Sequence, residues 1–373
     1  MTNTLPKGWE EKTLGDMCDI FDSKRRPITQ KDRIKGEYPY YGATGIVDYV
    51  DGYLFDEPLL LIGEDGAKWG KGEECAFIAR GKYWVNNHAH ILKPKDNLSM
   101  QYLVYWLNYS DLNPYITGTT VPKLNQQKLK SIKMSFPSLP EQKRIVEKLD
   151  KIFADIDKAK ENTQKNLTNA KEIFYSSLNN IFTGKMNGWK EKTLGEVCEV
   201  IAGQSPSSIY YNDCGEGLPF YQGKKEFSDK YINSATVWTS ETTKIALAND
   251  ILMSVRAPVG PVNYATEKCC IGRGLAAIRP KKEVETDFVF YFLQSIEKKI
   301  AGHDGTVFNS ISRKEIEKIN IPVPPLPEQK KIVAQLDALR DKAQELEQIY
   351  TKKLADLDEL KQSVLQQAFS GKL

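Results

Sequence analysis

Glu64, Asp65 and Lys68 are the charged residues in this sequence that come nearest to a hydrolytic site. Two carboxylates and an ammonium group could bind a metal ion and activate water against a phosphodiester. Their spacing, however, is not that of a metal-dependent nuclease. His88 and His90 would share one face of a strand, but no cysteine or carboxylate set stands at metal-ligand spacing around them. We therefore predict no catalytic residue and no bound metal.

The motifs of DNA-modifying enzymes and molecular motors are also missing. A DNA methyltransferase needs a glycine-rich cofactor loop that opens a βαβ unit, and an Asp/Asn-Pro-Pro-aromatic segment that holds the flipped base. Asn113-Pro114-Tyr115 lacks the second proline. No GxxxxGK[ST] phosphate loop is present, which argues against an ATP-driven motor. The chain is expected to be non-catalytic and to hold no cofactor of its own.

The cysteine content and the hydropathy pattern indicate a soluble cytoplasmic protein. The six cysteines contain no CxxC pair and are too sparse for a disulfide framework, so we expect reduced thiols. The start, MTNTLPKGWEEK, lacks the basic end and apolar stretch of a secretory signal. No run approaches the roughly 18 apolar residues of a membrane helix, so no membrane partner is expected.

The net charge of +3 is low for a protein that would hold DNA mainly by neutralising phosphates. If the chain binds nucleic acid, either its cations are concentrated on one face or a partner supplies much of the electrostatic attraction. Composition alone therefore does not identify a DNA-binding protein.

The chain is a tandem repeat, and this repeat is the most informative feature of the sequence. Three pairs of segments recur at offsets of 180 and 187 residues, whereas residues 21–97 and 201–283 do not align. Each half thus has a shared frame around an interior that differs, as expected of two similarly mounted recognition modules with different specificities. The repeated segments are KGWEEKTLG (7–15) and NGWKEKTLG (187–195), PSLPEQKRIV (137–146) and PPLPEQKKIV (324–333), and FTGKM (182–186) and FSGKL (369–373).

Two long amphipathic segments follow the modules. Their apolar residues recur in steps of four and three, which is the heptad pattern of a coiled coil. Each segment predicts a helix of about 44 residues, or roughly 65 Å, with a proline in the first turn (Pro140, Pro327) and a glycine at the end (Gly184, Gly371). The expected seam residues are Ile145, Leu149, Ile152, Ile156, Ala159, Leu167, Ala170, Ile173, Phe174 and Leu178, and Ile332, Leu336, Leu339, Ala343, Leu346, Tyr350, Leu354, Leu357, Leu360, Lys361 and Leu365; Thr163 and Asn166 interrupt the first seam.

An apolar stripe of this length must be buried, and two arrangements could bury it. The chain could form a homodimeric coiled coil, or its two helices could pack on each other. We favour internal packing, in which the helices run antiparallel because the first leads to the second module and the second leads back. By pseudo-symmetry, Gly371–Leu373 should then lie beside Gly8-Trp9.

The modules have the pattern of mostly-β domains. Short apolar runs such as PLLLI (58–62), AHIL (89–92), DILMSV (250–255) and LAAI (275–278) are separated by turn residues. Helices are expected at Ser99–Asn108 and Thr286–Ser295 and after the caps Asn125 and Ser312. The sequence therefore predicts an α+β protein, with two pseudo-symmetric mostly-β domains separated by two long antiparallel coiled-coil helices. The predicted boundaries are 1–139 and 187–326 for the domains, and 140–186 and 327–373 for the helices.

Polar, basic and aromatic residues in the loops of the modules are the candidates for DNA contact. Arg suits guanine, Asn and Gln suit adenine, and Tyr or Trp can line the groove. The threonines are included because a helix N-terminus can hold a phosphate, although a plain turn is the alternative. The candidates are Lys24, Arg25, Arg26, Tyr40, Tyr41, Lys68, Trp69, Lys71, Asn86, Asn87, His88, Thr119, Thr120 and Lys123, and Gln204, Ser205, Tyr221, Gln222, Lys224, Lys225, Arg256, Arg273 and Thr306.

Two GWxxxTLGxxC-like openings, each followed by LPEQKxIVxxLD and a long helix that ends in F-[TS]-G-K, resemble the specificity subunit of type I restriction-modification systems. The resemblance covers essentially the whole chain. It implies that the modules are target-recognition domains, each reading one half of a split site in double-stranded DNA. The helices would set the unread spacer and dock two methyltransferase subunits, and motor-nuclease subunits would join them. S-adenosylmethionine, ATP and Mg would then be bound by those partner subunits alone.

Three alternatives remain open at this point. The chain could serve a system that methylates DNA without cleaving it. It could instead be a coiled-coil scaffold that spaces two protein-binding modules, in which case it would not bind DNA selectively. A self-contained enzyme is the third alternative, and the missing motifs argue against it.

Overall fold

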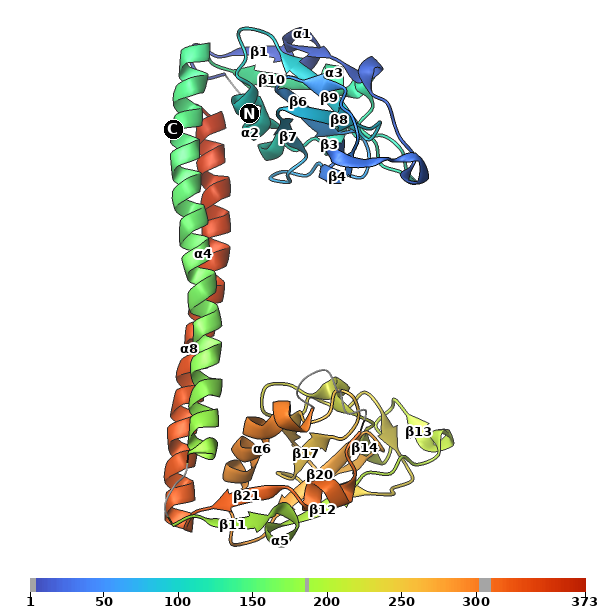
Figure 1. Ribbon diagram of the computed structural model, residues 1–373, viewed down its shortest axis with the longest axis vertical. Helices are drawn as coiled ribbons and strands as arrows, with labels where there is room; N and C mark the ends of the chain where they lie inside the picture. The colour runs from blue at the N-terminus through green and yellow to red at the C-terminus, as the bar shows by residue number, and fades with distance from the viewer. Residues whose placement is uncertain (1–4, 185–187, 302–309) are drawn as a thin grey trace. The chain divides into compact units, whose positions relative to one another are not determined.

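The computed structural model divides the chain into two compact units. Unit 1 comprises Met1–Gln164 and Lys352–Leu373, and unit 2 comprises Lys165–Thr351. Two long helices, α4 (Leu139–Thr183) and α8 (Leu326–Phe369), contribute residues to both units (Figure 1). Each unit also contains a mostly-β domain, which confirms the predicted α+β class. The described residues are 5–184, 188–301 and 310–373.

The domain of unit 1 consists of two four-stranded sheets and a two-stranded ribbon. Its elements are β1 (Glu10–Thr13), α1 (Leu14–Met17), β2 (Cys18–Ile20), β3 (Lys35–Gly42), β4 (Gly45–Val50), β5 (Phe55–Asp56), β6 (Leu59–Gly63), β7 (Ala76–Ala79), β8 (Lys82–Val85), β9 (Ala89–Pro94), α2 (Met100–Tyr109), α3 (Gln126–Ser131) and β10 (Lys133–Phe136), with 3-10 turns at Asp22–Lys24, Gln30–Asp32 and Asn113–Tyr115. The sheets have the orders β2-β9-β6-β7 and β4-β3-β8-β5, and β1 pairs with β10.

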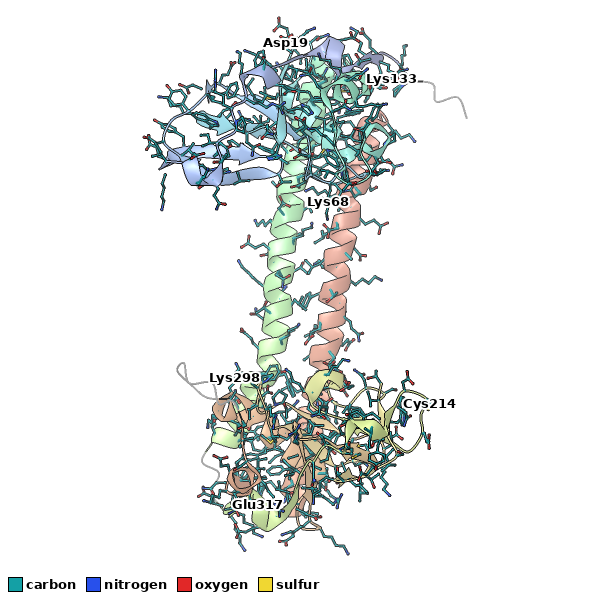
Figure 2. The ribbon with its side chains drawn as sticks, turned by 90° about the vertical axis from the view of Figure 1, so that its right-hand side faces the viewer. Asp19, Lys68, Lys133, Cys214, Lys298 and Glu317 are labelled. Atoms are coloured by element: carbon teal, nitrogen blue, oxygen red, sulfur yellow. The ribbon has the colours of Figure 1, made fainter. Side chains whose placement is uncertain are left out.

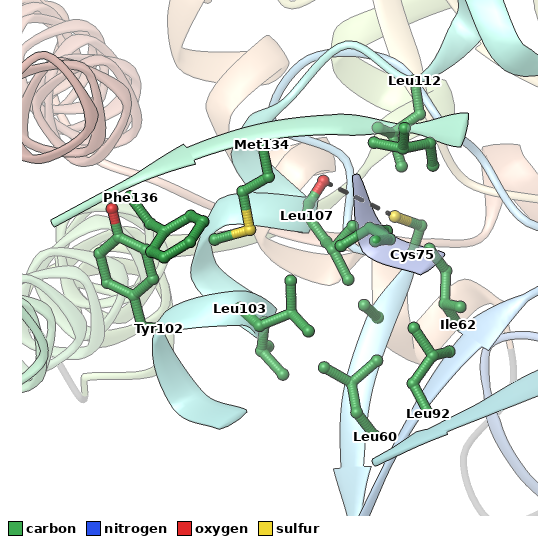
Figure 3. Packing of buried hydrophobic residues seen from close by; sticks show 14 of the residues in the cluster. Leu60, Ile62, Cys75, Leu92, Tyr102, Leu103, Leu107, Leu112, Met134 and Phe136 are labelled. Atoms are coloured by element: carbon green, nitrogen blue, oxygen red, sulfur yellow. Dashed lines mark hydrogen bonds between the residues drawn. The ribbon is translucent and has the colours of Figure 1, made fainter. Parts of the chain in front are cut away.

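The apolar run of β6 is explained by burial on both faces. Leu60 and Ile62 point into a core shared with α2, whereas Leu59 and Leu61 point into a second core beneath the other sheet. Side chains alternate along a strand, so a strand covered on both sides needs apolar residues at every position. Figure 3 shows the first core, in which Tyr102, Leu103 and Leu107 of α2 face residues of β6, β9 and β10, and the Cys75 thiol donates to the Leu107 carbonyl at 3.8 Å.

The domain of unit 2 repeats the ribbon and one four-stranded sheet of this topology, but its other sheet has five strands. Its elements are β11 (Lys190–Thr193), α5 (Leu194–Val197), β12 (Cys198–Ala202), β13 (Tyr211–Asn212), β14 (Leu218–Tyr221), β15 (Trp238–Thr239), β16 (Ile245–Ala246), β17 (Ile251–Ser254), β18 (Val262–Tyr264), β19 (Cys269–Ile271), β20 (Leu275–Pro280), α6 (Thr286–Ile300), α7 (Arg313–Glu317) and β21 (Asn320–Val323), with 3-10 turns at Ser208–Tyr210 and Lys224–Glu226. The ribbon β11-β21 and the sheet β12-β20-β17-β18 match β1-β10 and β2-β9-β6-β7. The five-stranded sheet has the order β13-β15-β14-β19-β16. In the remaining sheet of each domain, one parallel pair recurs: β3 with β8, and β14 with β19.

The helix caps follow the sequence prediction. Asn125 accepts a hydrogen bond from the Lys128 N–H, and Ser312 forms a capping box with Glu315. The same type of box opens α1 and α5, where Thr13 and Thr193 cap the helices. Cap side chains satisfy N–H groups that have no partner within the helix, and this explains where these short helices begin.

Segments of α4 and α8 run antiparallel within each unit, side by side in Figures 1 and 2. In unit 1, Arg144 donates to the Leu373 carbonyl just beyond α8, and Lys160 pairs with Asp358. In unit 2, the Lys171 ammonium lies 3.7 Å from a Glu347 carboxylate oxygen, and Phe174 contacts the guanidinium of Arg340. Residues that follow one another on α4 thus meet residues in reverse order on α8. The prediction of internal antiparallel packing is confirmed for each unit.

Three predicted seam positions are wrong. Ile173, Leu346 and Leu360 are 52%, 37% and 46% exposed, although they fit the heptad spacing. The helices face a domain as well as each other, so the buried stripe is shifted from an ideal coiled-coil seam. It includes Phe153, which packs on α2, and Thr163, whose hydroxyl donates to the Ala159 carbonyl at 2.7 Å.

The LPEQ segment fastens each long helix to its domain. Gln142 is fully buried; its Oε1 accepts from the Ser99 N–H at 2.8 Å, and its Nε2 donates to the Pro137 carbonyl at 2.9 Å. Gln329 does the same in unit 2, where Oε1 accepts from the Glu285 N–H. In both units the amide thus joins the start of a long helix to the residue that begins α2 or α6. This contact gives the repeated glutamine a structural role.

All six cysteines are free, and five of them are buried. Burial raises the pKa of the Cys18, Cys75, Cys198 and Cys269 thiols to about 12, so these four stay protonated at neutral pH. Cys214, labelled in Figure 2, is exposed. None of the helices in the described part of the chain combines the length and apolar character needed to cross a membrane.

Candidate nucleic-acid interface

In each domain, loops from separate parts of the sequence meet where the parallel strand pair ends. In unit 1 the Asn86 N–H donates to the Tyr41 carbonyl at 3.0 Å, and in unit 2 the Gly272 N–H donates to the Tyr221 carbonyl at 2.8 Å. We call the two sets of loops loop cluster 1 and loop cluster 2. Loop cluster 1 contains residues 24–26, 42–44, 64–68, 86–88 and 117–123; loop cluster 2 contains residues 204–206, 222–225, 255–256, 272–274 and 310.

Backbone hydrogen bonds align the two clusters residue by residue, although their sequences do not align. The Arg26 N–H donates to Val85 as the Gln204 N–H donates to Ile271. The isolated β-bridge between Asp65 and Lys123 likewise has a counterpart between Arg256 and Ser310. Equivalent positions therefore hold different side chains on one backbone frame. The pairs are Arg26 and Gln204, Gly42 and Gln222, Asp65 and Arg256, Asn86 and Gly272, Asn87 and Arg273, and Lys123 and Ser310.

Loop cluster 2 brings three predicted residues into one hydrogen-bonded group. The Ser205 hydroxyl donates to Gln222 Oε1 at 2.9 Å and accepts from the Arg273 N–H at 3.2 Å. A Cβ at position 272 would stand 2.8 Å from Gln222 Oε1, so Gly272 is required for this close approach. The Gln222 and Arg273 side chains are exposed on this ordered base. They can therefore offer an amide held by Ser205 and a guanidinium whose backbone is held by the same residue.

Loop cluster 1 is built over a buried network of charges. Asp22 and Glu64 are each 8% exposed. Burial alone would raise the pKa of Asp22, but hydrogen bonds from His90 and Gln126 and the charge of Arg25 hold it below its usual value. The Lys123 ammonium, 2.8 Å from Glu64 Oε1, and the Arg25 guanidinium outweigh burial and lower the pKa of Glu64 in the same way. Both carboxylates therefore remain ionised.

This network does not fit a resident metal ion. Asp22, Glu64 and His90 place potential ligand atoms within 4.8 Å of one another. However, the His90 Nδ1 is 2.6 Å from an Asp22 oxygen, and its Nε2 is 2.6 Å from the Leu124 carbonyl. Both ring nitrogens are thus engaged, and Arg25 and Lys123 already balance the two carboxylates. The network instead fixes the loops that surround it.

Five predicted contact residues are wrong because the structure buries them or uses them internally. Tyr40 and Tyr221 are each 1% exposed, and their hydroxyls bond to backbone atoms of Ile28 and Asn233. Trp69 is 5% exposed and donates to the Gly63 carbonyl. Arg25 is enclosed by Asp22, Glu64 and the Ala89 carbonyl. Asn86 is 6% exposed, and its Oδ1 accepts from the His88 N–H.

The phosphate-binding geometry predicted for Thr119 and Thr120 is also wrong. Both lie in an exposed turn closed by hydrogen bonds between Thr117 and Lys123, and α3 begins only at Gln126. Thr306 lies outside the described residues. The structure places the other candidates on the surface, with Tyr41 and Ser205 half-buried; Lys68, labelled in Figure 2, is 81% exposed. The exposed candidates are Lys24, Arg26, Lys68, Lys71, Asn87, His88, Gln204, Gln222, Lys224, Lys225, Arg256 and Arg273, and Lys123 is partly exposed.

Two residues at the clusters were missed by sequence reasoning. Asp65 lies 2.5 Å from His88 Nδ1 and 4.0 Å from the Lys123 ammonium, so it presents a carboxylate where Arg256 presents a guanidinium in unit 2. The Thr243 hydroxyl donates to the Gln204 carbonyl and steadies that loop. The local sequence drew attention to Asp65 only as part of an acidic cluster and did not distinguish Thr243, because their places in the loop clusters follow from long-range contacts.

Comparison of the sequence with known proteins shows the family to which this chain belongs. The sequence matches the family described as "Type I restriction modification DNA specificity domain" twice, over residues 6–167 and 186–354. It is 34% identical to the putative type I restriction enzyme MjaX specificity subunit of Methanocaldococcus jannaschii, covering 99% of this chain and 94% of that protein. The Escherichia coli EcoDI specificity subunit is 22% identical, over 99% and 89% of the two chains.

Two solved structures are also similar to this chain over almost its whole length. The HsdS subunit from Thermoanaerobacter tengcongensis superimposes with a TM-score of 0.67 at 26% identity, over 99% of this chain and 98% of that one. A chain from a structure described as "Structural basis underlying complex assembly and conformational transition of the type I R-M system" gives a TM-score of 0.82 at 28% identity, over 99% and 100%. The protein therefore belongs to the family of type I restriction-modification specificity subunits, the DNA-recognition and not the catalytic component of these systems.

Proposed function

We propose that each domain reads one half of a split DNA site through its loop cluster. The observation that carries this proposal is the pair of equivalent backbone frames with different side chains. Asp65 of loop cluster 1 occupies the position that Arg256 occupies in loop cluster 2, and Asn87 occupies the position of Arg273. An arginine favours guanine, an asparagine favours adenine, and an aspartate accepts from the cytosine amino group. Such exchanges on a constant frame would give each domain a different preferred sequence.

The long helices would set the length of the unread spacer and dock two methyltransferase subunits. Their exposed surfaces are largely polar but include the apolar residues Ile173, Leu346 and Leu360, and the segments that begin the helices recur in both repeats. S-adenosylmethionine would be bound by the methyltransferase subunits, and ATP and Mg by motor-nuclease subunits. Because the net charge of this chain is low, the partner subunits would supply much of the electrostatic attraction that holds the DNA.

The test is a map of methylated adenines in cells that express this chain with its methyltransferase. Replacing residues 16–118 by the corresponding segment of another specificity subunit should change one half of the methylated sequence and leave the other half unchanged. The reciprocal exchange in the second domain is the matched control and should change only the other half. Methylation that is independent of this chain, or that changes in both halves after one exchange, would contradict the proposal.

A further inference from the structure

Unit 2 contains a cavity of about 320 Å³ where α4, α6 and α8 meet the domain. Phe174 and Lys171 of α4, Gln294 and Glu297 of α6, and Arg340 of α8 contribute to its lining. The cavity is separate in sequence from most of loop cluster 2, with which it shares only Lys224. The other residues predicted to read DNA do not line it.

Arg340 is a buried cation with unused hydrogen-bonding capacity. It is 9% exposed, and its Nη2 donates to the Asp229 carbonyl at 2.8 Å. Its guanidinium carbon lies 5.5 Å from the ring centre of Phe174 and 5.7 Å from that of Tyr291, and the guanidinium also interacts with the Tyr291 hydroxyl. Among the described residues, no hydrogen-bond partner faces its buried Nη1, and none faces the buried Oε1 of Gln294. Nor does any described carboxylate form a salt bridge with this guanidinium.

The equivalent junction in unit 1 also has a cavity, of about 460 Å³, but Lys361 and Asn108 in its lining have partners. Phe153 stands at the position of Arg340, and Lys361 stands at the position of Phe174, so the cation and the aromatic ring have exchanged helices. The Lys361 ammonium lies 5.1 Å from the ring centre of Phe153 and 3.9 Å from a Glu74 carboxylate oxygen. The counterpart of Gln294 is Asn108, whose Oδ1 accepts from the N–H groups of Cys75 and Ala76. In unit 1, therefore, the Lys361 ammonium has a carboxylate partner and the Asn108 amide oxygen has hydrogen-bond donors.

We propose that the cavity of unit 2 receives the carboxylate of an aspartate or glutamate from a docked methyltransferase subunit. This inference rests on the proposed docking of that subunit to the helices. A buried cation is costly unless an anion pairs with it, and the planar guanidinium forms its strongest hydrogen bonds with carboxylates. Gln294 can donate to the same carboxylate after a half-turn of its amide, because its Oε1 has no partner to lose among the described residues.

A protein carboxylate fits the cavity better than a DNA phosphate. Asp229, Glu297 and Glu347 also line it, and a nucleic-acid strand would bring further negative charge against all three. A single incoming carboxylate would meet less repulsion than a strand of phosphates, and Lys171 and Lys224 in the lining offset part of it. More than half of the lining residues come from α4, α6 and α8, and α4 and α8 are the helices to which docking is proposed.

The experiment titrates the purified methyltransferase subunit into the full chain by calorimetry, comparing wild type with R340M and R340K. R340M keeps the length of the side chain but removes its charge. Loss of one partner from a buried charge pair should weaken binding of one methyltransferase copy about 30-fold or more. R340K should recover most of the affinity. F153M, at the equivalent position of unit 1, is the matched control and should change the affinity less than threefold.

A chemical readout identifies the group that enters the cavity. Carbodiimide joins an amine directly to a carboxylate, so the lysine introduced by R340K should cross-link to one acidic residue of the methyltransferase. Cross-links only to Asp229, Glu297 or Glu347 of this chain would overturn the inference. So would equal affinities of wild type and R340M, or a loss of DNA affinity by R340M in the absence of the methyltransferase. If the methyltransferase does not bind the wild-type chain at all, the proposed function fails instead.

Discussion

Gly371 lies against the indole of Trp9 in unit 1. A Cβ at position 371 would stand 3.6 Å from the Trp9 Nε1 and 3.0 Å from the Cβ of Pro6, and the φ angle of Gly371 is +71°. The end of α8 therefore contacts the beginning of the first domain, as the pseudo-symmetry of the repeat predicts. The end of α4 and the beginning of the second domain are joined by the chain itself, because Gly184 is followed by Gly188 and Trp189 in the sequence.

A circular permutant should consequently fold. Joining Leu373 to Leu5 by a short Gly/Ser linker, and opening the chain between Thr183 and Gly188, should preserve both domains and the methylated sequence. The thermal midpoint and the methylation map measure this. In a matched control, the chain is opened within the buried strand β6 instead, and this variant should not fold. A folded permutant with a changed recognition sequence would contradict the expectation.

R273A should weaken recognition in the half-site read by the second domain. Ser205 holds the backbone of this residue, and its exposed guanidinium can donate to a base. Loss of a base contact of this kind costs about 1–3 kcal/mol, or roughly 5- to 150-fold in affinity for the preferred base. The measurement is methylation of a library randomised in both half-sites. K282A removes an exposed cation beyond the opposite end of β20 and should have no such effect.

Q142L and Q329L should each destabilise one unit. Each substitution leaves buried backbone groups without their partners, at a cost of about 1–3 kcal/mol. Denaturant unfolding of the full chain, followed by hydrogen exchange in each unit, checks both the size and the location of the effect. Q335L changes an exposed glutamine of α8 and should alter the unfolding free energy by less than about 0.5 kcal/mol. Equal effects of Q142L and Q335L would show that burial of the amide does not matter.

Unit 1 should be selectively sensitive to acid. The pKa values of Asp22 and Glu64 are lowered in the folded state, so the stability they contribute is present above their usual values of 3.8 and 4.5. That stability is lost as the pH falls through the lower, folded values. E64Q should reduce the thermal midpoint of unit 1 near neutral pH, and the difference from wild type should shrink below about pH 4. A difference that stays constant with pH would exclude a contribution from ionised Glu64.

Shortening the helices should change the spacer and leave both half-sites intact. Deleting residues 161–167 together with the opposed 351–357 removes about 10 Å of helix at 1.5 Å per residue and keeps the heptad phase. At 3.4 Å per base pair, the spacer between the two half-sites of the methylated sequence should shorten by about three base pairs. Deleting only one of the two segments breaks the pairing and serves as the control. An unchanged spacer would show that the helices do not set it.

The sequence by itself determined the architecture of this protein. The repeated GW–TLG and LPEQ segments predicted two equivalent domains, and the heptad spacing predicted two long helices that pair within the chain. These signals are local, because caps, turn residues and apolar periodicity act over a few residues. The contact between Gly371 and Trp9 also followed, since it depends only on the symmetry of the repeat.

Only the tertiary structure decided which loop residues are available to DNA. Trp69 and Lys68 are neighbours in the sequence, yet one is buried and the other is 81% exposed. Ile173 fits the heptad spacing but faces solvent, because the helices pack on a domain as well as on each other. The equivalence of Asp65 and Arg256 is invisible in the sequence, since it arises from backbone hydrogen bonds between distant segments. Burial and long-range pairing depend on the whole fold, and local patterns cannot encode them.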